Sequence, residues 1–213
     1  MTPAQRKRVA ARETPGGRER LLEAATALFA ERGYAATGIA ELCREAGVAK
    51  PALYWHFESK EGLLGAVIER VGSQWIERLQ KVVYLEGHPL QRIQRLVTEW
   101  RTILLEQPEL MRLPLIAQLE QGDSDRARAA LRKIWSRGDA ALIQGIEDTL
   151  GVQIQGVDLL AQTILDLLQG AALRQMAEPD PKRLARVFTD LQRTIAVLVA
   201  DRLPPEVKLE DLP

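Results

Sequence analysis

The stretch TGIAELCREAGVAKPALYWHF, residues 37–57, decides the fold of the first part of this chain. Thr37 can cap a helix, Glu41 in its first turns suits the helix dipole, and Gly47 ends it. A second, short helix from about Ala49 to Trp55 follows after only one or two residues. Such a tight break forces two helices to cross steeply, so the stretch predicts a helix-turn-helix.

Periodic apolar residues on either side of this motif predict further helices. One runs from near Arg18 to Gly33, and another starts after the capping residue Ser59 with an apolar stripe long enough to connect two domains. Glycine and proline breaks then indicate helices at about 89–106, 109–120, 123–149, 157–176 and 181–202. Because no convincing strand pattern occurs, we predict an all-α fold of about nine helices.

The composition is that of an ordinary globular protein, with 213 residues, 46% hydrophobic residues and a formal net charge of zero. The one cysteine, Cys43, excludes internal disulfides and suits a small buried side chain better than a redox sensor. The two histidines, His56 and His88, lie in no catalytic motif, so we expect no enzyme, no metal site and no cofactor. No apolar run is long enough for a membrane span, and we expect a cytoplasmic protein.

Five short motifs with consistent internal spacing carry a family resemblance. They are RLLEAATALF at 20–29, GY at 33–34, Thr37, AGVAKPALYWHF at 46–57 and SKE at 59–61. Together they resemble the DNA-binding domain of the TetR family over about fifty residues. The sequence departs from many members of that family at Gly38, Ala40 and Pro51, so the helix that begins near Thr37 contributes less to specificity here.

The resemblance implies a domain organisation that agrees with the helix pattern. We predict a basic flexible arm at 1–17, a helix-turn-helix domain at 18–62, a helical ligand-binding and dimerisation domain at 63–203, and a tail at 204–213. Residues 1–20 hold six Arg or Lys and two Glu, which gives a net charge of plus four. A solvated tail and an arm that follows DNA phosphates both fit this charge.

The second helix of the motif is short enough to enter a DNA major groove, which is about 12 Å wide. Lys50 is the first choice for a base or phosphate contact, the small Ala52 can approach a thymine methyl group, and Tyr54 can donate to a phosphate. His56 suits either a phosphate contact or a structural hydrogen bond. The predicted DNA-binding residues are Thr37, Ala49, Lys50, Pro51, Ala52, Tyr54, Trp55, His56 and Lys60.

The resemblance also implies a pocket for a small, often lipophilic ligand among the later helices. Candidate lining residues combine apolar area with an occasional polar group, and each equally suits an ordinary core; they are Trp75, Trp100, Met111, Gln118 and Trp135. In a dimer, two recognition helices must sit about 34 to 36 Å apart to meet successive major grooves. A ligand that favours another separation would release the DNA.

The last two helices carry more apolar surface than one intramolecular contact needs, and we predict that they form a homodimer interface. Burial of both helices inside one chain is the alternative. The predicted interface residues are Leu160, Ile164, Leu167, Leu168, Val187, Leu191, Ile195 and Leu198.

These features together predict a sequence-specific DNA-binding transcriptional regulator, most simply a repressor that a small lipophilic ligand releases from its operator. Two alternatives stay open: a helical interaction protein whose helix-turn-helix does not bind DNA, and an activator of the same family. An enzyme is disfavoured because paired catalytic groups are absent from the sequence.

Overall fold

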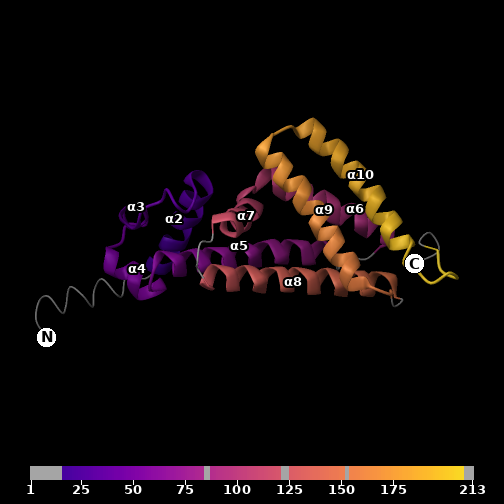
Figure 1. Cartoon of the computed structure of the whole chain (residues 1–213), viewed down its shortest axis with the longest axis horizontal. Coiled ribbons are helices and arrows are strands. Elements are labelled where there is room, and N and C mark those ends of the chain that lie inside the picture. The colour runs from indigo at the N-terminus through magenta and orange to yellow at the C-terminus, as the bar shows by residue number, and fades with distance from the viewer. Residues whose placement is uncertain (1–15, 84–86, 121–124, 152–153, 209–213) are drawn as a thin grey trace, which may run out of the picture. The chain divides into compact units, whose positions relative to one another are not determined.

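The computed structural model describes residues 16–83, 87–120, 125–151 and 154–208 (Figure 1). Nine helices and no strand occur in this described part, which confirms the predicted all-α class. The basic residues before position 16, and with them most of the predicted arm, lie outside it. The helices are α2 (Gly17–Arg32), α3 (Ile39–Glu45), α4 (Lys50–Phe57), α5 (Lys60–Val83), α6 (Pro89–Glu106), α7 (Glu109–Glu120), α8 (Asp125–Leu150), α9 (Val157–Ala177) and α10 (Pro181–Ala200).

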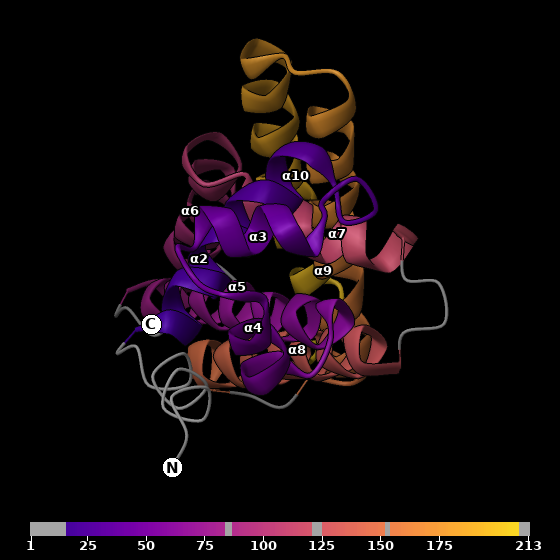
Figure 2. The same ribbon diagram turned by 90° about the vertical axis from the view of Figure 1, so that its left-hand side faces the viewer.

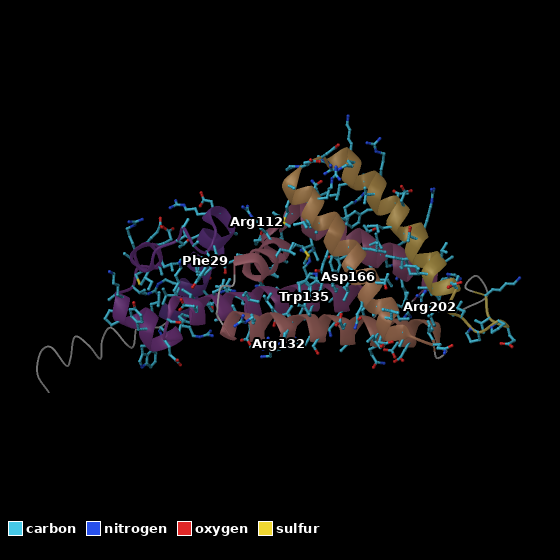
Figure 3. All side chains as sticks on the ribbon, viewed as in Figure 1. Phe29, Arg112, Arg132, Trp135, Asp166 and Arg202 are labelled. Atoms are coloured by element: carbon cyan, nitrogen blue, oxygen red, sulfur yellow. The ribbon has the colours of Figure 1, made fainter. Side chains whose placement is uncertain are left out.

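The chain divides into two compact units, and the first, residues 1–73 and 112–134, contains the helix-turn-helix. Its short helices enclose one apolar core, because α2, α3 and α4 each contribute fully buried side chains: Leu21, Phe29, Leu42 and Leu53. Phe29, labelled in Figure 3, packs edge-on against Tyr34 with ring centroids 5.4 Å apart. Burial of these side chains, rather than helix propensity, holds three such short helices in place.

The turn between α3 and α4 is fixed by backbone and side-chain hydrogen bonds. Gly47 has a φ of 59°, in the left-handed region that favours glycine. The amide of Val48 donates to the carbonyl of Cys43 at 2.9 Å, and Nε of Arg20 donates to the carbonyl of Ala46 at 2.9 Å. Arg20 therefore ties α2 to the end of α3, which gives this part of the family motif a structural role.

The start of α3 differs from the prediction. Gly38, not Thr37, occupies the N-cap, and no side chain caps the helix there. The hydroxyl of Thr37 instead donates to the carbonyl of Gly33 at 2.8 Å, and the Thr37 amide donates to the carbonyl of Tyr34 at 3.3 Å. The predicted capping role is wrong, because Thr37 closes the loop before α3 rather than starting the helix.

Within the first unit, α5 and α8 approach closely at Gly72. An added Cβ there would lie 2.3 Å from Cδ1, 2.5 Å from Cγ1 and 2.9 Å from Cγ2 of Ile134. One turn earlier along α5, Glu69 forms an ion pair with Lys133 at 3.0 Å. The absence of a side chain at Gly72 thus allows Ile134 to pack directly onto the backbone of α5.

The second unit, residues 74–111 and 135–213, contains the longer helices of the C-terminal part. In it α10 packs against α6 and α9, and Figures 1 and 2 show α9 and α10 side by side in opposite directions. Asp180 begins α10 by accepting hydrogen bonds from the amides of Lys182 and Arg183, both at 3.0 Å. The turn at 178–180 thereby sets the hairpin.

The observed units do not follow the predicted domain boundary at residue 62. The first unit extends along α5 to Ser73 and also takes in residues 112–134. The contact of Gly72 with Ile134 gives the physical reason, because it packs the beginning of α8 onto α5. Helices α5, α7 and α8 each continue from one unit into the other.

Candidate functional site

Helix α4, the second helix of the motif, has one buried face and one exposed face. Leu53 and Phe57 lie in the core of the first unit, whereas Tyr54 is 49% and Trp55 is 52% exposed. Lys50, at the first turn, is also exposed, and no acidic residue lies in that turn. This face combines a cation, a phenol and an indole, which are groups that contact phosphates and base edges in protein–DNA complexes.

The N-terminus of α4 adds backbone groups to the same surface. Ala49 is the N-cap and makes no side-chain cap hydrogen bond, and Pro51 lies in the first turn, where its missing amide costs nothing. Both residues are exposed, as predicted for groups near a DNA backbone, although their contacts with DNA stay predictions. Helix α4 thus presents Ala49, Lys50, Pro51, Tyr54 and Trp55 to solvent.

Two predicted DNA-binding residues are buried instead. Ala52 is 4% exposed and belongs to the core with Leu53, so little of its methyl group is available for the predicted contact with a thymine. Thr37 is 1% exposed and its hydroxyl donates to the carbonyl of Gly33, so the predicted phosphate contact would require this side chain to give up that hydrogen bond. Ala52 lies four residues before the half-buried His56, and residues at this spacing share one face of a helix.

His56 is half-buried and packs edge-on against Trp55, with ring centroids 4.5 Å apart. Burial, together with the positive charge of Arg18, lowers the pKa of His56 below its ordinary value. The imidazole is therefore neutral at physiological pH. It can offer a neutral hydrogen bond to a phosphate but no charge.

Lys60 begins α5 and is held by the loop before α3. Its Nζ donates to the backbone carbonyl of Tyr34 at 2.6 Å and lies 4.1 Å from the centroid of the Tyr34 ring. Burial and the neighbouring carboxylate of Glu61 raise the pKa of Tyr34 to about 12. Sequence reasoning missed this use of Lys60, since no local pattern links residues twenty-six positions apart.

The predicted ligand-binding residues lie in the second unit, apart from Gln118, whose side chain is outside the described part of α7. Trp75 packs edge-on against Trp100, with centroids 5.2 Å apart, and against Trp135, with centroids 6.1 Å apart. Trp75, Trp100 and Met111 are all buried. The structure thus brings three of the predicted residues into one aromatic cluster, labelled at Trp135 in Figure 3.

Two adjoining cavities lie in the second unit beside this cluster. Trp100 lines the first, and Leu96 and Leu142 line both. Most of the other lining residues are ordinary apolar side chains, such as Ile76 and Leu165, which carry no distinguishing sequence signal. The polar ones are Gln80 in the cavity beside Trp100 and Arg92 in the adjoining cavity. Of the residues predicted to line a ligand pocket, Trp100 lines one of these two cavities, whereas Trp75, Trp135 and Met111 line neither.

The predicted dimer interface needs correction. Five of its residues face the interior of the single chain and are buried there: Leu160, Ile164, Leu168, Leu191 and Ile195. Val187 is exposed, while Leu167 and Leu198 are half-buried. Three apolar residues outside the predicted set are exposed on the same two helices: Leu159, Leu173 and Val197. An interface on α9 and α10 would use these outward residues.

Among the described residues, no group of three or more His, Cys, Asp or Glu side chains is arranged to hold a metal ion. None of the described helices has the length and apolarity needed to cross a bilayer.

Comparison with known proteins identifies one matching family and a relative that covers most of the chain. Residues 21–67 match the family described as bacterial regulatory proteins, tetR family. The HTH-type transcriptional repressor KstR2 of Mycobacterium tuberculosis is 30% identical over 160 residues, which cover 70% of this chain and 76% of KstR2.

Solved structures extend the similarity to the fold of most of the chain. The reduced form of NemR from E. coli has a TM-score of 0.70 and 26% identity, covering 83% of this chain and 96% of NemR. FadR from Bacillus subtilis in complex with stearoyl-CoA shares the fold, with a TM-score of 0.67 and 17% identity over 83% of this chain and 96% of FadR.

Proposed function

The chain belongs to the TetR family of bacterial transcriptional regulators, and on that premise we propose that it is a repressor that binds operator DNA as a ligand-controlled homodimer. The family and the relatives are regulators, not enzymes. One observation carries the proposal: the second helix of the helix-turn-helix turns Lys50, Tyr54 and Trp55 outward while its other face fills the core. Repression is supported by the relative KstR2, which is a repressor.

We assign separate roles to the exposed groups of α4. The Lys50 ammonium contacts a base edge or a phosphate near the helix N-terminus, and the Tyr54 hydroxyl donates to a phosphate. Trp55 supplies apolar contact area beside them. His56, neutral at physiological pH, contributes at most a hydrogen bond. The Lys60 ammonium is held over Tyr34, so we assign Lys60 to fixing the start of α5 rather than to binding a phosphate.

The exposed apolar residues of α9 and α10 support association of two copies. Leu159, Leu173, Val187 and Val197 leave these helices with outward apolar side chains, which a protein–protein interface on α9 and α10 would cover. A twofold dimer reads two half-sites about 34 to 36 Å apart, so we expect an operator with inverted-repeat symmetry. A protein with this role works in the cytoplasm, where the DNA is.

Ligand control is supported by the cavities beside the tryptophan cluster and by FadR, whose similar fold holds stearoyl-CoA. Helices α5 and α8 line the cavity beside Trp100, and both continue into the unit that contains the helix-turn-helix. A ligand that shifts these helices would change the spacing of the recognition helices. Release follows only if the ligand binds the shifted state better.

The test is fluorescence anisotropy of the full-length protein with the DNA that flanks its own coding region. A shuffled duplex of the same length and composition is the control, and the salt concentration is varied. We expect tighter binding to one flanking site and a fall in affinity as salt rises. Equal affinity for every duplex at every salt concentration would exclude sequence-specific recognition at this locus, and a genome-wide selection that also returned no preferred site would overturn the proposal.

A further inference from the structure

Two buried indole N–H groups in the second unit call for an explanation. Trp75 and Trp100 are among the largest fully buried side chains, and within the described residues neither Nε1 atom has a hydrogen-bond partner. Buried donors in folded proteins are normally paired, because an unpaired donor loses its hydrogen bond to water and gains nothing in return. Groups of this kind mark a strained core or a place where another molecule supplies the acceptor.

The two rings are held rigidly. Their planes are nearly perpendicular, at 89°, and Trp75 also packs against Trp135 on α8. Gly138 faces the Trp75 ring so closely that an added Cβ would lie 3.1 Å from Cη2 and from Cζ3. Neither indole can turn its N–H toward solvent without unpacking this cluster. A neighbouring ring face is only a weak acceptor for such a donor.

A cavity lies directly beside Trp100. It has about 20 Å³ of space for the centres of water molecules, which is room for about one, and the adjoining cavity has about 50 Å³. The described residues that line the cavity beside Trp100 include no charged side chain, and Gln80 is its only polar side chain. Its apolar walls include Ile76, Leu79, Leu96, Leu142, Leu165 and Leu168.

We propose that this cavity is the effector site and that the effector is a neutral, mostly apolar molecule that offers an oxygen acceptor to the indole N–H of Trp100, which is covered in this structure and becomes accessible as the effector parts the surrounding helices. A pure hydrocarbon would leave the donor unpaired. A carboxylate beside Trp100 would be buried with no cation in the wall of the same cavity, since Arg92 lines the adjoining one, and burying an unpaired carboxylate is far more costly than burying a carbonyl. Trp75 positions the Trp100 ring and holds a second unpaired donor beside it.

The proposal also explains how occupancy would act on the protein. The present space is far smaller than the 300 to 1,000 Å³ typical of small-molecule sites, so an effector must part the helices that line it. Those helices are α5, α6, α8 and α9. Only the regulatory role of the bound molecule rests on the proposed function. The chemistry of the site is argued from residues of the second unit.

The experiment observes the indole groups directly, by ¹H–¹⁵N correlation spectra of the full-length protein labelled at the four tryptophans. Three probes of similar size are added in turn: benzylacetone, a neutral ketone; butylbenzene, without an acceptor; and phenylbutyrate, an anion. Resonances are assigned with single Trp→Phe variants. Trp55, exposed on α4 in the other unit, is the internal control.

We expect benzylacetone to move the Trp100 resonance downfield, as a new hydrogen bond to oxygen does, and to leave Trp55 unchanged. Its affinity should exceed that of butylbenzene by about threefold to tenfold, the usual net effect of one hydrogen bond, and that of phenylbutyrate by a larger factor, because the carboxylate must also lose its water. Trp100→Phe keeps an aromatic side chain, although a smaller one, and removes the N–H donor, so it should abolish the preference for the ketone over the hydrocarbon. Trp55→Phe should retain it.

Three results would overturn the proposal: no binding of the ketone, equal binding of the hydrocarbon, or tighter binding of the anion. Thermal unfolding of Trp100→Phe shows whether this variant keeps the fold. If the variant does not fold, the binding of the three probes to the unmodified protein tests the proposal. Because these spectra contain no DNA, their outcome is separate from that of the operator assay. A protein that binds DNA but shows no ketone preference loses this inference alone.

Discussion

Replacement of Gly72 by alanine tests the packing of α5 on α8 within the first unit. Alanine is the better helix former, and in an exposed helix the change gains about 0.5 to 1 kcal/mol. At Gly72 the new Cβ would meet Ile134 at 2.3 to 2.9 Å. The contact with Cγ2 cannot be relieved by turning the far end of the side chain, because a β-branched residue in a helix has essentially one rotamer.

The magnitude follows from these opposing effects. Overpacking a dense core costs about 1 to 3 kcal/mol. Subtracting the gain in helix propensity leaves a net destabilisation of about 0.5 to 2 kcal/mol. For a chain of this size such a loss lowers the melting temperature by about 1 to 8 °C. The matched control is Gly170→Ala on α9, where nothing lies within 4 Å of the added Cβ, and there the melting temperature should rise.

The assay is thermal unfolding of both variants and of Ile134→Ala with and without Gly72→Ala. The Ile134→Ala change alone opens a cavity, since Ile134 is fully buried, and the alanine methyl at position 72 should partly fill it. We therefore expect the double variant to be more stable than the sum of the single effects by about 1 kcal/mol or more. Strict additivity, or a Gly72→Ala protein as stable as Gly170→Ala, would refute this account of the contact.

Three further predictions concern single groups. The hydrogen bond from the Arg183 amide, together with that from the Lys182 amide, lowers the pKa of the Asp180 carboxyl. The charged cap therefore stabilises α10 fully at any pH above the ordinary pKa of aspartate. This stabilisation is lost as the pH falls through the lowered pKa. Asp180→Ala should then melt earlier at neutral pH, while Asp180→Asn, still an acceptor, should melt close to the parent; a deficit that persists in strong acid argues against the cap. Because the pKa of Tyr34 is raised to about 12, the neutral phenol stabilises the fold below pH 10 and this contribution disappears between pH 10 and 12. In a rapid pH-jump absorbance titration, one of the three tyrosines should ionise late, and Tyr34→Phe should remove that phase; ionisation of all three near pH 10 contradicts the assignment. Val197→Glu, on exposed α10 surface, should shift sedimentation from dimer to monomer, unlike the control Lys208→Glu, and an unchanged dimer would place the interface elsewhere.

Local signals were sufficient to predict the helices. Ser59 caps α5 as expected, with its Oγ accepting from the amide of Gly62 at 3.0 Å. Pro89 stands in the first turn of α6, and Gly33 ends α2 with a φ of 86°. Each of these effects involves residues within one turn of a helix end, which is why sequence spacing reveals them.

Predictions that depended on the direction in which a side chain or a helix face points were less accurate. Thr37 had the right residue type for a cap, but the loop carbonyl of Gly33 competes for its hydroxyl. Helices α9 and α10 are apolar on more than one face, so periodicity did not show which face packs inside the chain, and Leu160 and Ile195 were assigned to the wrong side. The cavity beside Trp100 depends on contacts among four helices, and no local pattern encodes such contacts.

The central claim is that the exposed face of α4 reads DNA, and the most direct measurement compares the operator affinity of Lys50→Ala/Tyr54→Ala with that of Lys208→Ala, which removes one lysine charge in the second unit. Both variants are titrated against the DNA site that the unmodified protein prefers, across a salt series. Their melting temperatures show whether the fold is kept. We expect the double variant to lose at least tenfold in operator affinity, and the slope of log affinity against log salt to be shallower by about two if each Lys50 of the dimer neutralises a phosphate. Lys208→Ala should bind like the parent. A folded double variant that binds the operator with the parent's affinity would contradict the claim.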